Sequence, residues 1–127
     1  MKMLPNMTVI VPCDFNQTKQ ATMAIADMEG PVYLRFGRPS VPIFTKPDAN
    51  FQIGKADVLI KGSDVTIIAC GHLVWKAIEA AQKLSVLGIS AEVINMHTIK
   101  PLDTQAILNS VGKTGCVVTA EEHMING

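Results

Sequence analysis

Imidazole and carboxylate side chains follow three apolar segments of the chain, where they could bind a ligand or transfer protons. His72 follows the first of these segments and His97 the second. The third is followed by Glu121, Glu122 and His123. Zinc accepts such side chains as ligands, but their spacing matches no metal-ligand motif, so no metal site is predicted. Hydrogen bonds to strand ends and loop backbone, or a place in a pocket or interface, are the alternatives.

The adjacent carboxylates of Glu121 and Glu122 could take part in acid–base chemistry, because one carboxylate raises the pKa of its neighbour. Consecutive residues of an extended segment, however, point to opposite sides. We therefore expect only one of the two glutamates to face a given pocket. The sequence contains no P-loop, GxGxxG, CxxC or Ser/His/Asp pattern, so these residues predict no reaction that the chain could run alone.

Two arginines lie close together at the end of an apolar segment. Arg35 and Arg38 are separated by Phe36 and Gly37, and alternation along a strand predicts different surroundings for the two guanidinium groups. An arginine at a strand end can bind phosphate or carboxylate through two parallel hydrogen bonds, and glycine allows a ligand to approach closely. Binding of an anionic ligand and pairing with a nearby acid are both open at this point.

The elements that position these residues alternate between strand and helix. Residues 8–12 predict a strand, Asp14 predicts the N-cap of a helix, and residues 31–37 predict the next strand. These elements form one βαβ unit. Residues 38–50 contain three prolines and no sustained periodicity, which predicts an extended connector.

The alternation then restarts in the second half of the chain. Strands are expected at residues 56–60, 65–70, 91–96 and 116–121, with helices after Gly71 and after Asp103. The expected fold class is α/β, with a mostly parallel sheet in a three-layer α/β/α arrangement. Because parallel strands end at one edge, we expect the histidines and glutamates to gather at the carboxyl edge, where open α/β sheets bind ligands.

The composition limits the classes of function. The 127 residues are enough for one domain or parts of two. Eleven Lys and Arg balance eleven Asp and Glu, so no net charge favours nucleic acid, and no apolar segment is long enough to predict a membrane span. The cysteines, expected to be buried and reduced, are Cys13, Cys70 and Cys116. With no signal-peptide pattern, a soluble cytoplasmic protein is expected.

Five segments occur in the order that one enzyme family shows. They are LPNMTVIVPCD (4–14), GPVYLRFGRPSVP (30–42), GSDVTIIACGHLVWKAIEAA (62–81), INMHTIKPLD (94–103) and TGCVVTAEEH (114–123). The resemblance covers essentially the whole chain, and INMHTIKPLD and TAEEH are its most specific motifs. The sequence resembles a transketolase, in particular the carboxyl-terminal subunit of a split transketolase.

The resemblance implies a homo-oligomeric enzyme, expected to be a dimer, that uses thiamine diphosphate and Mg²⁺ to transfer a two-carbon ketol unit between sugar phosphates. It places the last βαβ portion of a pyrimidine-binding domain at residues 1–38, a linker at 39–55 and a transketolase C-terminal domain at 56–127. Both domain portions are expected to be incomplete. The family's cofactor-binding and ketose-binding segments precede the PNM motif. The isolated chain is therefore expected to bind no cofactor, to be inactive, and to need an amino-terminal transketolase subunit.

One family role carries over by position. The arginine of the GRP motif, which binds the phosphate of the sugar substrate, matches Arg38. The family assigns no catalytic step to its C-terminal domain, so the resemblance places no catalytic residue in this chain. The further candidates for the carboxyl edge or an interface are Arg35, His72, His97, Glu122 and His123.

Two other functions fit the same pattern. The first is part of a 2-oxo acid dehydrogenase E1 β subunit or a deoxyxylulose-phosphate synthase, because these enzymes share the transketolase architecture. The second is a non-catalytic module that binds a ligand or an assembly partner at the carboxyl edge.

Overall fold

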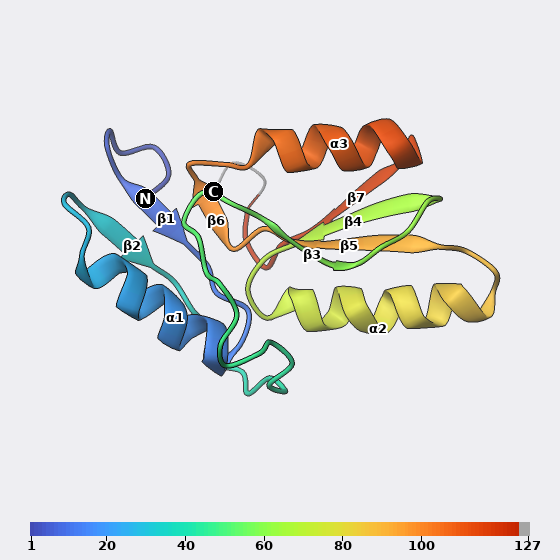
Figure 1. Ribbon diagram of the computed structural model, residues 1–127, viewed down its shortest axis with the longest axis horizontal. Helices are drawn as coiled ribbons and strands as arrows, with labels where there is room; N and C mark the ends of the chain where they lie inside the picture. Colours follow the sequence, from blue (N-terminus) through green and yellow to red (C-terminus); the bar gives the residue numbers. More distant parts are fainter. Residues whose placement is uncertain (125–127) are drawn as a thin grey trace.

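The computed structural model describes residues 1–124, in which three helices pack against two β-sheets (Figure 1). The smaller sheet and helix α1 lie at one end of the molecule. The larger sheet lies between helices α2 and α3 at the other end. None of these described helices is both long enough and apolar enough to cross a membrane.

The smaller sheet combines the beginning of the chain with a strand from its second half. Its order is β2 (Val32–Leu34), β1 (Thr8–Ile10) and β6 (Thr98–Lys100). β1 and β2 are parallel and are joined through α1 (Phe15–Ala26), as the βαβ pattern predicts. β6 runs antiparallel to β1. No periodicity predicts this three-residue strand, which depends on the backbone groups offered by the free side of β1.

Asp14 fixes both the start of α1 and part of the connector after β2. Its carboxylate accepts hydrogen bonds from the backbone N–H groups of Gln17 (2.9 Å), Phe44 (2.9 Å) and Thr45 (2.7 Å). Burial opposes ionisation of Asp14, but the hydrogen bonds from Gln17, Thr45 and Phe44 outweigh it and hold the pKa of the carboxyl below its ordinary value. The predicted N-cap is confirmed.

The larger sheet provides the edge on which the candidate site lies. Its described strands are, in order, β3 (Asp57–Ile60), β5 (Ala91–Asn95), β4 (Val65–Ala69) and β7 (Val117–Ala120). β5, β4 and β7 are parallel, and β3 is antiparallel to β5. Helix α2 (Leu73–Val86) covers one face and helix α3 (Thr104–Thr114) the other (Figure 1). The predicted three-layer α/β/α arrangement is confirmed.

The two faces of the larger sheet are packed differently. Ile67, Val74 and Val93 are buried in an apolar core between the sheet and α2. On the α3 face, the hydroxyl groups of Thr66 and Ser110 lie 2.7 Å apart.

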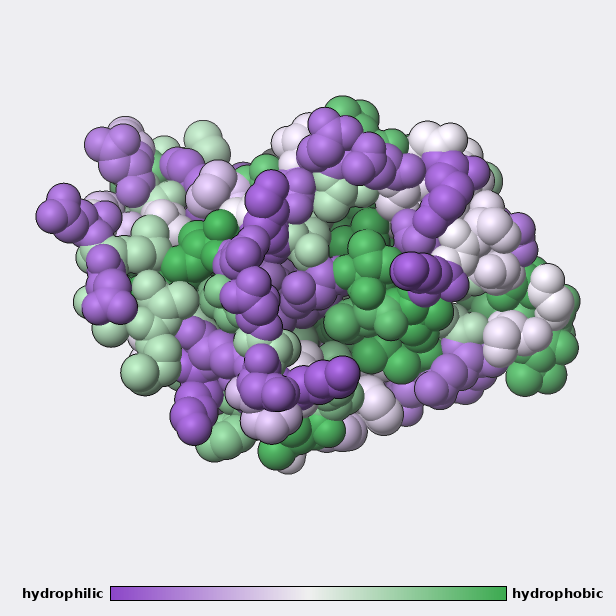
Figure 2. All heavy atoms as spheres, in the orientation of Figure 1, coloured by the Kyte–Doolittle hydropathy of each residue, from purple (hydrophilic) through white to green (hydrophobic). Residues whose placement is uncertain are grey.

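Figure 2 shows hydrophobic side chains on the side where β3 lies, and Val58 of this strand is 48% exposed. Neither helix therefore covers this edge of the sheet completely.

Backbone contacts join the two sheets beside the carboxyl ends of β4 and β5. The N–H of Val11 donates to the carbonyl of His97 (2.7 Å), and the N–H of Gly71 donates to the carbonyl of Val11 (3.3 Å). Gly71 has a φ of +58°, and a Cβ built on it would lie 3.0 Å from Val11 Cγ1. Glycine is required here by both the backbone angle and the close approach.

The cysteines follow the prediction only in part. Cys13 and Cys70 are buried and all three thiols are free. The expectation for Cys116 is wrong, because this residue is exposed. It precedes β7, an edge strand of the described sheet in which Val117 and Val118 are 47% and 54% exposed.

Candidate functional site

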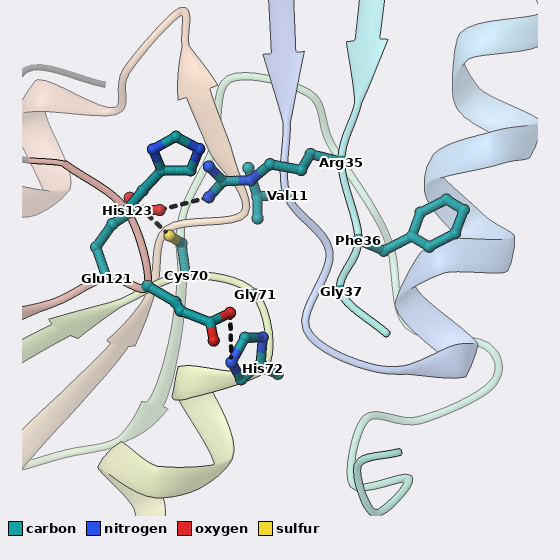
Figure 3. A pocket seen from close by; sticks show the side chains of 10 residues that line it. Val11, Arg35, Phe36, Gly37, Cys70, Gly71, His72, Glu121 and His123 are labelled. Carbon is teal, nitrogen blue, oxygen red and sulfur yellow. Dashed lines mark hydrogen bonds and ion pairs between the residues drawn. The ribbon is translucent and has the colours of Figure 1, made fainter. Parts of the chain in front are cut away.

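A cleft of about 150 Å³ lies where the end of β2 faces the carboxyl ends of β4 and β7 (Figure 3). We name it the carboxyl-edge cleft. It is lined by Val11, Arg35, Phe36, Gly37, Cys70, Gly71, His72, Glu121, Glu122 and His123. The strand ends thus bring together most of the residues singled out from the sequence, and the smaller sheet adds Arg35.

Arg35 extends from the end of β2 to the larger sheet (Figure 3). Its Nη2 pairs with Glu121 Oε1, and the Cys70 thiol donates a hydrogen bond to Glu121 Oε2 at 3.1 Å. Burial opposes ionisation of Glu121, but the hydrogen bonds from Arg35 and Cys70 outweigh it and lower the pKa of this carboxyl. Glu121 is therefore an ionised anchor between the sheets and is poorly suited to act as a general base at neutral pH.

Cys70 is equally unsuited to nucleophilic chemistry. Burial and the neighbouring Glu121 carboxylate raise the pKa of the Cys70 thiol to about 12. The thiolate is the reactive form of cysteine, so Cys70 is almost entirely in its unreactive form at neutral pH. Its contact with Glu121 was not anticipated from the sequence, although its place at the end of β4 put it on the same edge.

His72 and Glu122 form the second pair in the cleft. His72 Nε2 lies 2.9 Å from Glu122 Oε2. Both Glu121 and Glu122 line the cleft, whereas strand alternation predicts only one there. The reason is that β7 ends at Ala120, so the alternation no longer applies to the bend that carries the two glutamates.

Arg38 lies outside the cleft lining and is exposed. Within residues 1–124, no hydrogen bond or ion pair engages its guanidinium group. Phe36, between the two arginines, points away from the ion pairs and toward α1 (Figure 3). The two arginines therefore have different surroundings, as expected, but strand alternation is not the cause, because β2 ends at Leu34 and both arginines follow it.

His97 lies at the same edge but belongs to a separate group, which we name the buried cluster. Its members are Cys13, Gln17, Asp57, Asn95 and His97. Gln17 Oε1 accepts hydrogen bonds from Cys13 N and from Asn95 Nδ2, both at 3.0 Å, and Gln17 Nε2 donates to Asp57 Oδ2 at 3.1 Å. The amide of Gln17 thus joins α1 to two strands of the larger sheet.

The His97 ring is held in the buried cluster as a neutral group. Its Nδ1 lies 3.0 Å from Thr98 Oγ1, and its ring centroid lies 4.3 Å from that of Phe51. Burial lowers the pKa of His97 to about 4. Its Nε2 has no hydrogen-bond partner and lies 3.7 Å from Asp57 Oδ2, a distance too long for a hydrogen bond. The structure therefore does not bring His97 together with the other histidines.

The sequence did contain a signal for the buried cluster. Asn95 is a polar residue inside an apolar strand segment, and Gln17 lies on the face of α1 that carries the buried Ala21. Buried polar groups of this kind usually have hydrogen-bond partners. The pattern could not, however, identify which partners they have.

The described residues do not by themselves fit thiamine diphosphate with Mg²⁺. Magnesium prefers oxygen ligands, and a protein usually binds it through one or two carboxylates together with phosphate oxygens and water. In the carboxyl-edge cleft, Glu121 is occupied by Arg35 and Cys70, and Glu122 by His72. Across residues 1–124, no group of three or more His, Cys, Asp or Glu side chains is arranged to hold a metal ion.

Comparison with known proteins gives one consistent family. The profile of the transketolase C-terminal domain matches residues 54–127. The 6-deoxy-6-sulfo-D-fructose transketolase subunit SqwH of Clostridium sp. (strain MSTE9) is 47% identical over 128 residues, which cover 100% of this chain and 39% of that protein. A subunit of the apulose-4-phosphate transketolase of Phocaeicola vulgatus is 40% identical over 124 residues, which cover 97% of this chain and 40% of that protein.

A solved structure gives the same result for the fold. It is described as a split-gene transketolase in an inactive β4 tetramer, is 48% identical, and superposes with a TM-score of 0.94 over 97% of this chain and 41% of its own. The chain thus spans about two fifths of the length of these relatives. Both sheets lie within the matched region. The chain belongs to the transketolase family.

Proposed function

We propose that this chain is the carboxyl-terminal part of a transketolase that transfers a two-carbon ketol unit between sugar phosphates. The observation that carries the proposal is the match to split transketolase subunits across both sheets. In this proposal, residues 1–38 end a pyrimidine-binding domain, residues 39–55 form a linker and residues 56–127 belong to a transketolase C-terminal domain. We further propose a cytoplasmic homo-oligomer.

The proposal assigns thiamine diphosphate and Mg²⁺ to the complete enzyme. Thiamine diphosphate supplies the carbanion-stabilising chemistry of such transfers. Its site is assigned to segments outside this chain, because the acids of the carboxyl-edge cleft are occupied by Arg35, Cys70 and His72. An amino-terminal transketolase subunit is therefore the required partner.

Arg38 is the substrate-binding residue of this chain in the proposal. Its guanidinium group is exposed and has no partner among the described residues, whereas Arg35 is paired with Glu121. A free guanidinium group can bind a phosphate through two parallel hydrogen bonds. The phosphate end of a sugar phosphate is the ligand chemistry that this arrangement suits.

Reconstitution tests the proposed function. This chain is mixed with a polypeptide that carries the amino-terminal transketolase segments, together with thiamine diphosphate and Mg²⁺. Ketol transfer from xylulose phosphate is then measured with a coupled assay. We expect activity in the mixture and none from either polypeptide alone, with a heat-unfolded sample of this chain as the control.

Three other outcomes would contradict the proposal. Transfer by the isolated chain would contradict the need for a partner. Activity of the mixture on pyruvate in place of the ketose phosphate would favour a 2-oxo acid dehydrogenase or a deoxyxylulose-phosphate synthase. A stable complex without either activity would favour an assembly module.

A further inference from the structure

His72 connects the end of the larger sheet to the loop that carries Arg38. It occupies the N-cap position of α2, but its side chain makes no capping hydrogen bond. The ring instead pairs through Nε2 with Glu122 at 2.9 Å, and its side chain is only 21% exposed. The imidazole therefore does not cap α2, and the pair with Glu122 sets the orientation of the ring.

The other ring nitrogen of His72 faces Gly37, the residue before Arg38. A Cβ built on Gly37 would lie 3.1 Å from His72 Nδ1 and 3.1 Å from Pro39 Cδ. Gly37 does not have a left-handed backbone conformation, so the constraint on a side chain here comes from these two contacts, and an added Cβ would require the His72 ring or Pro39 to shift. The imidazole ring of His72 therefore packs directly against the loop at Gly37.

The contact between His72 and Gly37 separates two hollows of the surface. Both residues line the carboxyl-edge cleft, and both also line a neighbouring groove of about 340 Å³ next to the start of α1. The surface is therefore hollow on both sides of this contact. The loop has no regular secondary structure between β2 and β3. The contact with the His72 ring therefore strongly influences the path of the backbone at Gly37.

We propose that His72, held by Glu122, is a positioning residue that supports Gly37 and thereby directs Arg38 toward the phosphate of the substrate. The inference rests on the proposed role of Arg38. It gives the C-terminal domain a part in substrate selection, although the domain supplies no group that contacts the reacting atoms. Misplacing a binding group by a fraction of an ångström weakens an interaction that depends on two parallel hydrogen bonds.

The test uses the complete enzyme with its amino-terminal partner and compares a phosphorylated with an unphosphorylated donor ketose. The measured quantity is the ratio of kcat/KM for the two donors. Arg38→Ala should lower this ratio by roughly a hundredfold. His72→Ala should lower it by about five- to tenfold, through KM for the phosphorylated donor, with kcat on the unphosphorylated donor retained.

Three further variants separate positioning from a general structural role. Gly37→Ala should lower the ratio as His72→Ala does, because its Cβ displaces the ring or the loop. Glu122→Ala should lower it, whereas Glu122→Gln should retain it, since the amide oxygen can still accept a hydrogen bond from His72. Gln105→Ala, an exposed change on α3, is the control.

A double variant shows whether His72 acts through Arg38. Arg38→Ala combined with His72→Ala should have the ratio of Arg38→Ala alone, because nothing is left to position. Full additivity of the two effects would overturn the inference. If His72→Ala does not fold, Glu122→Ala provides the same test from a side chain that is 66% exposed.

The remaining outcomes distinguish this inference from the function on which it rests. If Arg38→Ala lowers the ratio and the variants of His72, Gly37 and Glu122 do not, the positioning role is wrong and the function of Arg38 stands. If Arg38→Ala leaves the ratio unchanged, the proposed phosphate contact and the positioning role both fail.

Discussion

The carboxyl-edge cleft and the buried cluster contain similar residue types but differ in how their charges are held. In the cleft, Glu121 is paired with Arg35, and Glu122 with His72. In the buried cluster, Asp57 accepts a hydrogen bond from Gln17, while His97 Nε2 has no hydrogen-bond partner. Both groups lie at the edge of the larger sheet where its parallel strands β4, β5 and β7 end.

The difference shows that position at a sheet edge does not by itself give a side chain a functional role. Burial lowers the pKa of His97 to about 4 and raises the pKa of Asp57, so in both groups burial opposes the charged form. In the cleft, hydrogen bonds from Arg35 and Cys70 lower the pKa of Glu121 despite its burial. The buried cluster therefore joins α1 to the sheet, and the cleft holds ionised groups within reach of solvent.

Removing the centre of the buried cluster should give the largest loss of stability. Gln17 is 2% exposed. Gln17→Met would leave the Cys13 N–H and the Asp57 carboxyl without this partner, and the Asn95 amide would keep only its weaker hydrogen bond to Cys13 Sγ at 3.4 Å. Buried polar groups without partners each cost roughly 1–3 kcal/mol, so we expect a loss of about 3 kcal/mol in urea denaturation. Gln20→Met on the same helix is the control and should cost much less, because the hydrogen bonds of Gln20 are exposed. Equal losses would contradict the comparison.

The pH dependence of stability should identify His97 as a neutral buried group. Its pKa falls from 6.5 to about 4 on folding, so between these values the unfolded chain binds more protons and stability decreases as the pH is lowered. Wild type should lose about 2 kcal/mol more than His97→Gln between pH 7 and pH 5.

Asp57 acts in the opposite direction. Burial raises the pKa of its carboxyl, so the folded chain takes up this proton more readily than the unfolded chain as the pH is lowered. The difference between wild type and His97→Gln isolates the histidine, because both proteins contain Asp57. Parallel stability curves for the two proteins would show that His97 is not held in its neutral form.

Breaking the cleft pair should have a smaller effect that depends on salt. Arg35→Met removes the partner of Glu121, whose side chain is 33% exposed. We expect a loss of about 1 kcal/mol at low ionic strength and less at high salt, because solvent and counter-ions screen the pair. Lys76→Met, which breaks the exposed pair with Glu79, should cost still less. If Arg35→Met lowered the stability as much as Gln17→Met does, the expected difference between the cleft and the buried cluster would be contradicted.

The sequence predicted the regular elements better than the contacts between them. The N-cap at Asp14 and the positions of α2 and β4 follow from local rules and are confirmed. β6 was not predicted, because its pairing with β1 joins residues about ninety positions apart and leaves no local periodicity. The exposure of Cys116 was missed because a sequence pattern does not show which strand lies at an edge of the sheet.

The sequence predicted which residues gather at the candidate site, but not which of them pair with one another. Parallel strand ends placed His72, Glu121 and Glu122 at one edge, and the structure brings them together. The pairing of Arg35 with Glu121 depends on how the two sheets dock, which no periodicity encodes. His97 lies outside the cleft, with its ring against Phe51 of the connector between β2 and β3.

The proposed role of Arg38, as the residue through which this part of a transketolase binds the substrate phosphate, can be tested directly. The measurement is kcat/KM of the assembled enzyme for phosphorylated and unphosphorylated donor ketoses, with Arg38 and with Arg38→Ala. We predict that the preference for the phosphorylated donor falls by roughly a hundredfold, while transfer from the unphosphorylated donor is retained. An unchanged preference in a folded and assembled Arg38→Ala enzyme would contradict this role.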